Sequence, residues 1–406
     1  MRLLHLSPAY APFHGGAEIL AQQISERFAR AGHEVTVVTT QAERPHDFWE
    51  GAPPRRSQCE TLNGVTVVRL PLRAWPPAPW TFHVAHRLAQ AASNWPGDLS
   101  LWLAGKLPRI AGLCATLQQL PACDAIHAVN MHFPALAVAA WREARRRNVP
   151  LLVTPFLHAN GSRIYPRTVL REAAVVMAQS QVEVEALQRV GIALERIRIT
   201  GVGIDLKAVR GGNGARFRRA YHIGDEPLVA FVGTASLDKG ALDVYHAMQR
   251  IWQRGVNARM VFAGSLMPAV APVVQADERC CCLGVVSDEV KRDLLAAATL
   301  LAMPSRVESL GLAYLEAWAN GLPVIGARVG ATTELIAHGV NGLLVPFGDD
   351  DALAAAIQSL LADGVTCRRL GDQGRELVES LYTWTQVFPR IADAYEQAVS
   401  QRHSST

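Results

Sequence analysis

Short runs of β-branched and aliphatic residues alternate with longer amphipathic stretches along most of the chain. This pattern is typical of βαβ units and parallel sheets. In the first half, the runs predicted to be strands are 3–6, 35–39, 65–70, 125–129, 151–154, 175–178 and 197–200, with helices between them such as 17–31 and 135–147. A second series predicts strands at 228–232, 260–263, 280–283, 300–303, 323–326 and 343–345. The expected fold class is therefore α/β with two sheets.

The junction between the two series is expected near residue 204. There Gly201-Val202-Gly203-Ile204-Asp205 precedes the glycine-rich stretch 211–214. At 406 residues the chain is long for one core, since a domain averages roughly 150 residues. We expect one domain at 1–204 and a second at 205–384. Open parallel sheets bind ligands beyond the carboxyl ends of their strands, so two facing sheets predict a ligand in an interdomain cleft.

Composition places the chain among well-packed globular proteins, since 50% of its residues are hydrophobic and 19% are charged. No apolar run reaches the roughly 18 residues that span a bilayer, and the first expected strand starts at Leu3, which leaves no room for a signal peptide. A cytoplasmic location is expected.

Seven cysteines, three of them adjacent at 280–282, form neither a disulfide framework nor a CxxC metal pattern, so we expect them to be reduced and mostly buried.

Charge is distributed unevenly along the chain. The first 200 residues carry 21 Lys and Arg against 14 Asp and Glu, whereas the remainder carries 19 against 22. A basic first half suits an anionic acceptor or an acidic membrane surface, and a solvated face such as Arg145-Arg146-Arg147 is the simpler alternative. No nucleic-acid partner is expected.

The connection at 71–107 is long and contains four tryptophans: Trp75, Trp80, Trp95 and Trp102. Long connections of this kind often carry extra structure. We expect extra helices here, which either cover the cleft or make peripheral contact with an anionic membrane.

The segment 304–317 carries the pattern that is most informative about chemistry. It follows a buried run, and Gly311 permits close backbone approach where a helix is expected to begin. Free amides at a helix start suit a diphosphate, and here they belong to Ser309, Leu310 and Gly311. Glu308 and Glu316 are separated by seven residues, and each carboxylate can accept hydrogen bonds from the hydroxyls of a sugar or a ribose.

In this pattern the chain resembles the retaining nucleotide-sugar glycosyltransferases with the GT-B fold, often called family 4. The resemblance covers nearly the whole chain and implies two facing Rossmann-like domains. It implies that Glu308 contacts the transferred sugar and Glu316 the ribose, and that the backbone at Val285 holds the nucleotide base. It also implies that the C-terminal residues 385–406 cross back to the first domain.

The stretch 231–240 extends the resemblance, because Lys239 stands where the family has a lysine that neutralises the donor diphosphate. Lys239 is one of only four lysines in the chain, and a point charge suits a leaving phosphate. The family usually has an arginine at the position of Thr234, so one of two expected cations is missing. Arg306 on the neighbouring loop is the candidate to replace it.

In the first domain, Gly15 and Gly16 follow the first expected strand and open a helix. They resemble the family's glycine-rich loop, whose amides reach the donor phosphate or the acceptor, and they lack the Gly-x-Gly-x-x-Gly spacing of a dehydrogenase. His127 belongs to an Asp-x-x-His segment like that of the family, which implies a hydrogen bond to the transferred sugar. A structural glycine turn and a buried structural histidine are the alternatives.

The chain is therefore expected to be a retaining hexosyl- or related glycosyltransferase that acts on a saccharide or lipid-linked acceptor, with Lys239, Glu308 and His127 as catalytic residues. The nucleotide sugar is a substrate, and no cofactor is expected. No metal is expected either, because the acidic run Asp349-Asp350-Asp351 is interpreted as complementing a helix N-terminus. Two alternatives stay open: a nucleotide-sugar epimerase of the same architecture and a non-catalytic nucleotide-sugar-binding protein.

Overall fold

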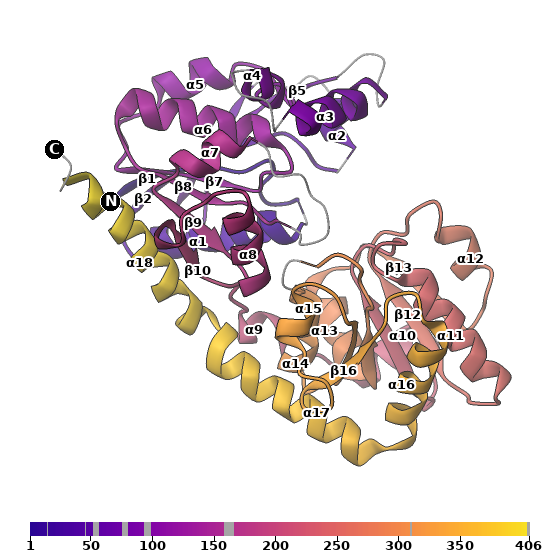
Figure 1. The fold of residues 1–406 in the computed structure, drawn as a ribbon. Coiled ribbons are helices and arrows are strands. Elements are labelled where there is room, and N and C mark those ends of the chain that lie inside the picture. The colour runs from indigo at the N-terminus through magenta and orange to yellow at the C-terminus, as the bar shows by residue number, and fades with distance from the viewer. Residues whose placement is uncertain are drawn as a thin grey trace. The chain divides into compact units, whose positions relative to one another are not determined.

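The computed structural model describes residues 1–13, 15–44, 46–51, 57–74, 80–92, 99–157, 166–308 and 311–403. The chain divides into two compact units, each with its own sheet and helices (Figure 1). The first unit comprises Met1–Leu157, the residues up to Thr200 and the C-terminal residues from Phe388, and the second runs from Gly201 to Val387. The α/β fold class with two parallel sheets, expected from the hydrophobic pattern, is confirmed.

Among the described residues, the first unit contains an eight-stranded sheet. Its strands are β1 (Arg2–Leu6), β2 (Glu34–Thr40), β3 (Gln58–Leu62), β4 (Val65–Leu70), β7 (Ala125–Val129), β8 (Leu151–Thr154), β9 (Val175–Ala178) and β10 (Ile197–Ile199). The spatial order is β10-β9-β8-β7-β1-β2-β4-β3, and β3 pairs antiparallel with β4 while the other pairs are parallel. Strands β5 (Leu72–Arg73) and β6 (Arg109–Ile110) form a separate, short antiparallel pair, and both lie between β4 and β7 in the sequence. The central strands are buried throughout because helices cover both faces, which explains their continuous apolar runs.

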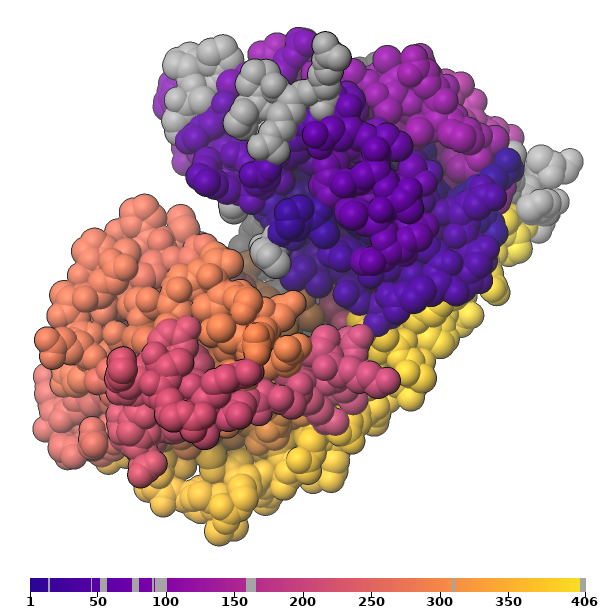
Figure 2. All heavy atoms as spheres, turned by 180° about the vertical axis from the view of Figure 1, so that it is seen from behind, coloured from indigo at the N-terminus to yellow at the C-terminus, as the bar shows by residue number. Residues whose placement is uncertain are grey.

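Helices flank this sheet on both faces (Figure 1). They are α1 (Gly16–Arg30), α2 (Asp47–Glu50), α3 (Trp80–Ala92), α4 (Leu99–Ala104), α5 (Leu113–Gln119), α6 (Pro134–Arg147), α7 (Arg167–Glu172), α8 (Gln181–Arg189) and the C-terminal α18 (Trp384–His403). Helices α5, α6 and α7 lie on one face, and α1, α8 and the last turns of α18 on the other. In Figure 2 the yellow end of α18 lies against indigo residues from the start of the chain. The first and last parts of the sequence therefore form one core.

The second unit has a six-stranded parallel sheet within the described residues. Its strands are β11 (Leu228–Val232), β12 (Arg259–Ala263), β13 (Cys280–Gly284), β14 (Leu300–Ala302), β15 (Val324–Ala327) and β16 (Gly342–Val345), in the order β13-β12-β11-β14-β15-β16. Its helices are α9 (Leu206–Val209), α10 (Gly214–Ala220), α11 (Ala241–Gln253), α12 (Ala271–Gln275), α13 (Asp288–Ala297), α14 (Leu312–Ala319), α15 (Thr332–Leu335), α16 (Asp350–Ala362) and α17 (Gly364–Leu377). Helix α14 packs on α17 at a point where only glycine fits, since a Cβ on Gly374 would lie 2.0 Å from the Trp318 ring.

The cysteines differ from the expectation. All seven are free thiols, but only Cys123 and Cys367 are buried, while Cys59 and Cys114 are exposed and residues 280–282 are half-buried. For Cys59 and residues 280–282 the physical reason is that β3 and β13 are edge strands, whose residues have neighbours on one side only, whereas Cys114 lies on α5. Within the described ranges, no helix is both long enough and apolar enough to span a membrane.

Candidate functional site

Lys239 and Glu308 meet at the point where the strand order of the second unit reverses, between β11 and β14. Lys239 lies in the loop after β11 and Glu308 in the loop after β14, so both follow carboxyl ends of adjacent strands. Ligands of open α/β sheets bind at such switch points. The Lys239 Nζ lies 2.7 Å from Glu308 Oε2 and donates to the Val307 carbonyl at 3.3 Å. The lysine side chain is 32% exposed, which leaves it accessible to an anionic ligand.

A second ion pair joins Glu316 on α14 to Lys291 on α13, with 2.7 Å between Oε1 and Nζ. Burial lowers the pKa of the Lys291 ammonium, but the attraction and the hydrogen bond of Glu316 outweigh burial, so this pKa is raised. Lys291 is not among the residues predicted from the sequence. The scarcity of lysine is the sequence feature that could have indicated it, because the chain has only four lysines. In the structure, two of these four pair with the two glutamates of the motif.

Gly311 begins α14 in a left-handed conformation, with φ of 82°. A Cβ at this position would lie 2.3 Å from the ring of Tyr314, which is buried and whose hydroxyl donates to the Met303 carbonyl after β14. Glycine therefore lets the first turn of α14 pack closely on the strand end. Ser309 and Leu310, predicted to supply amides for a diphosphate, lie outside the described residues.

Three further predicted residues follow strand ends of the same sheet. Thr234 is exposed after β11, and Val285 is exposed after β13. Arg306 follows β14; its guanidinium pairs with Asp238 and its backbone N–H donates to the Asp238 carbonyl at 2.8 Å. Arg306 is thus already paired with a carboxylate next to Lys239. Contacts of these three residues with a donor stay predictions.

In the first unit, the strand order reverses between β1 and β7, and a buried hydrogen bond joins α1, which follows β1, to the loop after β7. Gly15 caps α1 and Gly16 is its first residue. Glu18, in the first turn of α1, is buried and accepts a hydrogen bond from Asn130 Nδ2 at 2.8 Å. Burial raises the pKa of the Glu18 carboxyl, although the bond from Asn130 lowers it. The Asn130 Oδ1 in turn accepts from the backbone N–H of His132 at 3.0 Å.

These bonds order the loop that carries His132, whose side chain is exposed. His132 also lies close to His86 of α3, whose pKa is lowered chiefly by burial. The sequence prediction did not include His132 or Asn130. Their position in the sequence could have indicated them, because both residues follow the end of β7, whereas His127 lies in the middle of that strand.

His127, which is predicted to contact a sugar, lies in the interior of the first unit. Its side chain is 0% exposed, and both ring nitrogens have partners within the protein. The Nε2 atom lies 2.8 Å from Thr154 Oγ1, and Nδ1 lies 2.7 Å from the Tyr395 hydroxyl. Burial lowers the pKa of His127 well below its ordinary value. His127 is therefore a neutral structural residue that joins α18 to the sheet.

The hydrogen bonds around His127 fix the protonation of a second histidine, His5 of β1. The Ser25 hydroxyl donates to the Ala21 carbonyl at 2.7 Å, so it accepts from His5 Nδ1 at 2.8 Å. The His5 Nε2 then accepts from the Tyr395 hydroxyl at 3.0 Å, and the Tyr395 oxygen accepts from His127 Nδ1. Each group donates and accepts once, so both imidazoles are neutral.

Within the described ranges, no three His, Cys, Asp or Glu side chains are grouped to hold a metal ion. Asp349 accepts a hydrogen bond from the Ala352 N–H at 2.9 Å and so caps α16, while Asp350 and Asp351 pair with Arg250. The independence of the protein from metals and cofactors stays a prediction.

Comparison with known proteins bears on both units. Residues 15–203 match the family described as glycosyl transferase 4-like domain, and residues 215–377 match the family described as glycosyl transferases group 1. The chain is 26% identical to a D-inositol 3-phosphate glycosyltransferase from Xylanimonas cellulosilytica, over 99% of this chain and 97% of the relative. It is 25% identical to the MMP alpha-(1->4)-mannosyltransferase from Mycolicibacterium hassiacum, over 99% of both chains.

Solved structures resemble the fold along the full chain. The crystal structure of Anabaena HepE in complex with UDP and glucose matches with a TM-score of 0.72 and 19% identity, over 98% of this chain and 99% of that one. At this level of identity the likeness establishes the two-domain architecture alone.

Proposed function

Because the chain belongs to the glycosyltransferases with the GT-B fold, of the family 4 type, we propose that it transfers a sugar from a nucleoside diphosphate sugar with retention of anomeric configuration. The proposed acceptor is a hydroxyl of a saccharide or of a lipid-linked molecule. The observation that carries this proposal is the Lys239–Glu308 pair after β11 and β14. It joins a cation suited to a diphosphate to a carboxylate suited to a sugar hydroxyl.

In the proposed reaction, the bond between the anomeric carbon and the diphosphate oxygen breaks while the acceptor oxygen bonds to the same face of that carbon. The electron pair of the broken bond leaves with the nucleoside diphosphate. The proton of the acceptor hydroxyl passes to an oxygen of that diphosphate, so no protein base is needed. The protein contributes positioning and stabilisation of the developing negative charge.

Lys239 supplies the main positive charge for this step. The N-terminus of α14, which begins after Gly311, adds its partial positive charge. Without donor, Glu308 holds the ammonium in place. A bound diphosphate competes for that ammonium, and Glu308 then accepts a hydrogen bond from a sugar hydroxyl. Glu316, oriented by Lys291, accepts hydrogen bonds from the ribose.

In the first unit, the sugar-facing role that the resemblance gave to His127 belongs to the loop after β7. His132 is exposed there, and the Glu18–Asn130 bond holds its backbone. The amides near Gly15 and Gly16, at the start of α1, complete this edge of the first unit. They contact the donor phosphate or the acceptor.

Acceptor-dependent release of nucleoside diphosphate tests the proposed function. The full chain is incubated with UDP-, GDP- and ADP-sugars and a panel of saccharide acceptors, and the anomeric proton coupling of the product is read by NMR. We expect release only when acceptor is present, with the donor's configuration retained. Conversion of the donor sugar without acceptor indicates an epimerase, and binding without turnover indicates a binding protein; either result contradicts the proposal.

Thr234→Arg is expected to tighten binding of the cognate nucleoside diphosphate by about tenfold, because it adds a charge-assisted contact that is worth about 1.5 kcal/mol. Arg306→Ala is expected to change affinity less than about threefold, since Asp238 already holds the guanidinium. Isothermal titration calorimetry measures both, with Thr234→Val as the uncharged control. A tenfold loss in Arg306→Ala would show that Arg306, not the missing arginine, binds the diphosphate.

The exposed indoles of α3 and α4 form a membrane-contacting surface in the proposal. Trp80 is 68% exposed and Trp102 is 52% exposed, and the Lys106 Nζ lies 3.5 Å from the centroid of the Trp102 ring. Indole rings and a neighbouring cation suit an anionic lipid interface. Trp75 and Trp95 of the same segment lie outside the described residues.

Flotation on liposomes with anionic lipid checks this surface. We expect the wild type to float at low salt and a Trp80→Ser/Trp102→Ser double variant to lose most of that binding. Wild-type protein that stays at the bottom of the gradient at low salt removes the membrane proposal.

A further inference from the structure

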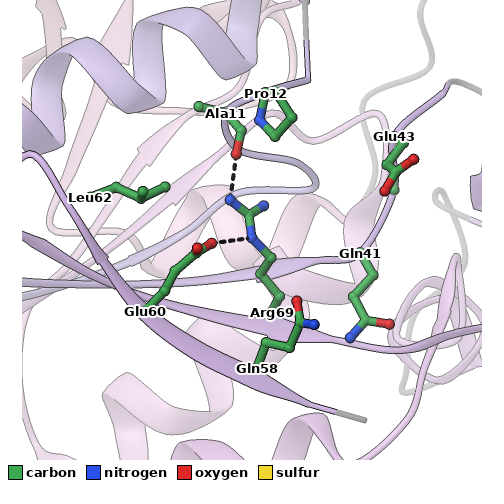
Figure 3. A pocket seen from close by; sticks show the side chains of 9 residues that line it. Ala11, Pro12, Gln41, Glu43, Gln58, Glu60, Leu62 and Arg69 are labelled. Carbon is green, nitrogen blue, oxygen red and sulfur yellow. Dashed lines mark hydrogen bonds and ion pairs between the residues drawn. The ribbon is translucent and has the colours of Figure 1, made fainter. Parts of the chain in front are cut away.

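A pocket lies in the first unit where β1, β2 and β4 end (Figure 3). In the strand order it is on the opposite side of β1 from β7. Its volume is about 430 Å³, which falls within the range of small-molecule sites. The lining comprises residues 11–12 after β1, residues 41–43 after β2, three residues of β3 and Arg69 of β4.

The edge strand β3 builds one wall of this pocket. It runs antiparallel to β4, with Gln58 directly opposite Arg69. Because side chains alternate along a strand, Gln58, Glu60 and Leu62 share one face with Arg69. Thr61 points to the other face of β3. The pocket wall is therefore polar at Gln58 and Glu60 and apolar at Leu62.

Arg69 is fixed in position and its charge is balanced. Its Nε lies 2.6 Å from Glu60 Oε1, and a second guanidinium nitrogen donates to the Ala11 carbonyl. The side chain of Arg69 is only 11% exposed. Figure 3 shows both bonds, with Gln41 and Gln58 beside the arginine side chain. Within the lining, Glu60 therefore neutralises the charge of Arg69.

This lining suits hydroxyl groups better than anions. The carboxamide of Gln58 offers donors and an acceptor, as a hydroxyl does, and Arg69 has five N–H donors in all. Pro12 and Leu62 present apolar surface suited to the C–H face of a sugar ring. A phosphate or carboxylate would have to compete with Glu60 for the guanidinium of Arg69.

We infer that this pocket binds an uncharged saccharide unit of the acceptor. The inference rests on the proposed function and narrows its acceptor to one whose bound unit carries no phosphate or carboxylate. The excess of basic residues in the first half of the chain therefore does not contribute to recognition of the acceptor in this pocket, because Arg69, the arginine that lines it, is neutralised by Glu60.

Saturation-transfer NMR on the full chain tests the pocket with named probes: the methyl α-glycosides of glucose, mannose and galactose, and the three corresponding 6-phosphates. We expect at least one methyl glycoside to bind wild type, with its 6-phosphate binding at least tenfold more weakly. Gln58→Trp, which fills the pocket, should abolish the signal. Thr61→Trp, on the opposite face of the same strand, should keep it.

Glu60→Gln adds a charge test without a change of shape. It removes the carboxylate that balances Arg69, so we expect binding of the 6-phosphate to strengthen at least fivefold while that of the methyl glycoside changes less than twofold. The inference is overturned if no methyl glycoside binds, if the 6-phosphates bind better to wild type, or if Gln58→Trp has no more effect than Thr61→Trp.

Titration with UDP, GDP and ADP separates this inference from the proposed function. These probes report on the second unit, where Lys239 and Glu308 lie. If no nucleotide binds and no donor is turned over, the proposed function fails. If a nucleotide binds equally to wild type and Gln58→Trp, and the methyl glycoside also binds equally to both, only the pocket inference fails.

Discussion

Lys239→Ala is expected to lower kcat by about 100-fold, which corresponds to about 2.7 kcal/mol of lost transition-state stabilisation. The charge matters most when the diphosphate departs, because that is when negative charge on its bridging oxygen is greatest. The cost in folding stability should be below about 1 kcal/mol, since the Lys239–Glu308 pair is partly exposed and such pairs contribute little. Steady-state kinetics and thermal unfolding measure the two effects.

Two variants control the Lys239 experiment. Lys207→Ala removes an exposed lysine from α9 of the same unit and should leave kcat unchanged. Glu308→Gln keeps the shape of the partner but removes its charge, and should slow transfer more than it weakens binding of the nucleoside diphosphate. Full activity in Lys239→Ala would remove the assignment of the donor phosphate to this loop.

Below pH 6.5 the first unit is expected to lose stability through His5 and His127. Burial lowers the pKa of His5 to about 3, whereas an unfolded histidine has its ordinary value of about 6.5. Between these pH values the unfolded state binds a proton that the folded state does not bind, so acid favours unfolding. Each such histidine costs about 1.4 kcal/mol per pH unit, or about 2 kcal/mol by pH 5.

Glu183 on α8 acts in the opposite direction. Burial raises its pKa to about 7, although it accepts hydrogen bonds from the N–H groups of Leu157 and Gln179. Its protonation therefore favours the folded state as the pH falls from 7 towards 4.5, and it offsets part of the histidine effect. A comparison of variants at each pH cancels this contribution.

The measurement is the free energy of unfolding in denaturant at pH 6 and at pH 5. We expect the loss of stability per pH unit to be smaller by about 1.4 kcal/mol in His127→Gln than in wild type. His5→Gln provides an independent second variant if the first does not fold. Identical slopes in wild type and in either folded variant would show that the buried histidines do not stay neutral.

The strands that the sequence predicts best are those buried on both faces. The bounds of β7, β8, β9 and β11 agree residue for residue with the apolar runs, because a strand between two helix layers needs apolar side chains at every position. Strand β3 is missing from the prediction. Its residues are polar and largely exposed, and what makes it a strand is pairing with β4, which local composition does not reveal.

For the site, the sequence indicates which loops carry chemistry but not how side chains pair. Lys239 and Glu308 are 69 residues apart, and their contact depends on β11 and β14 being neighbours in the sheet. His127 shows the opposite failure. The Asp-x-x-His pattern favours a ligand contact, but β7 continues to Val129, and the partner that occupies the ring, Tyr395, lies 268 residues further along the chain.

That long separation has a consequence for synthesis on the ribosome. The second unit is complete once Val387 has been translated, whereas the first unit still lacks the end of α18. His5 and His127 have no hydrogen bond to Tyr395 until that residue has been translated. At about 5–20 residues per second, the interval between the synthesis of His127 and that of Tyr395 is roughly 15–50 s. Nascent chains therefore carry an incompletely closed first unit while the second folds, and premature termination before Tyr395 leaves two unpaired nitrogens in its interior.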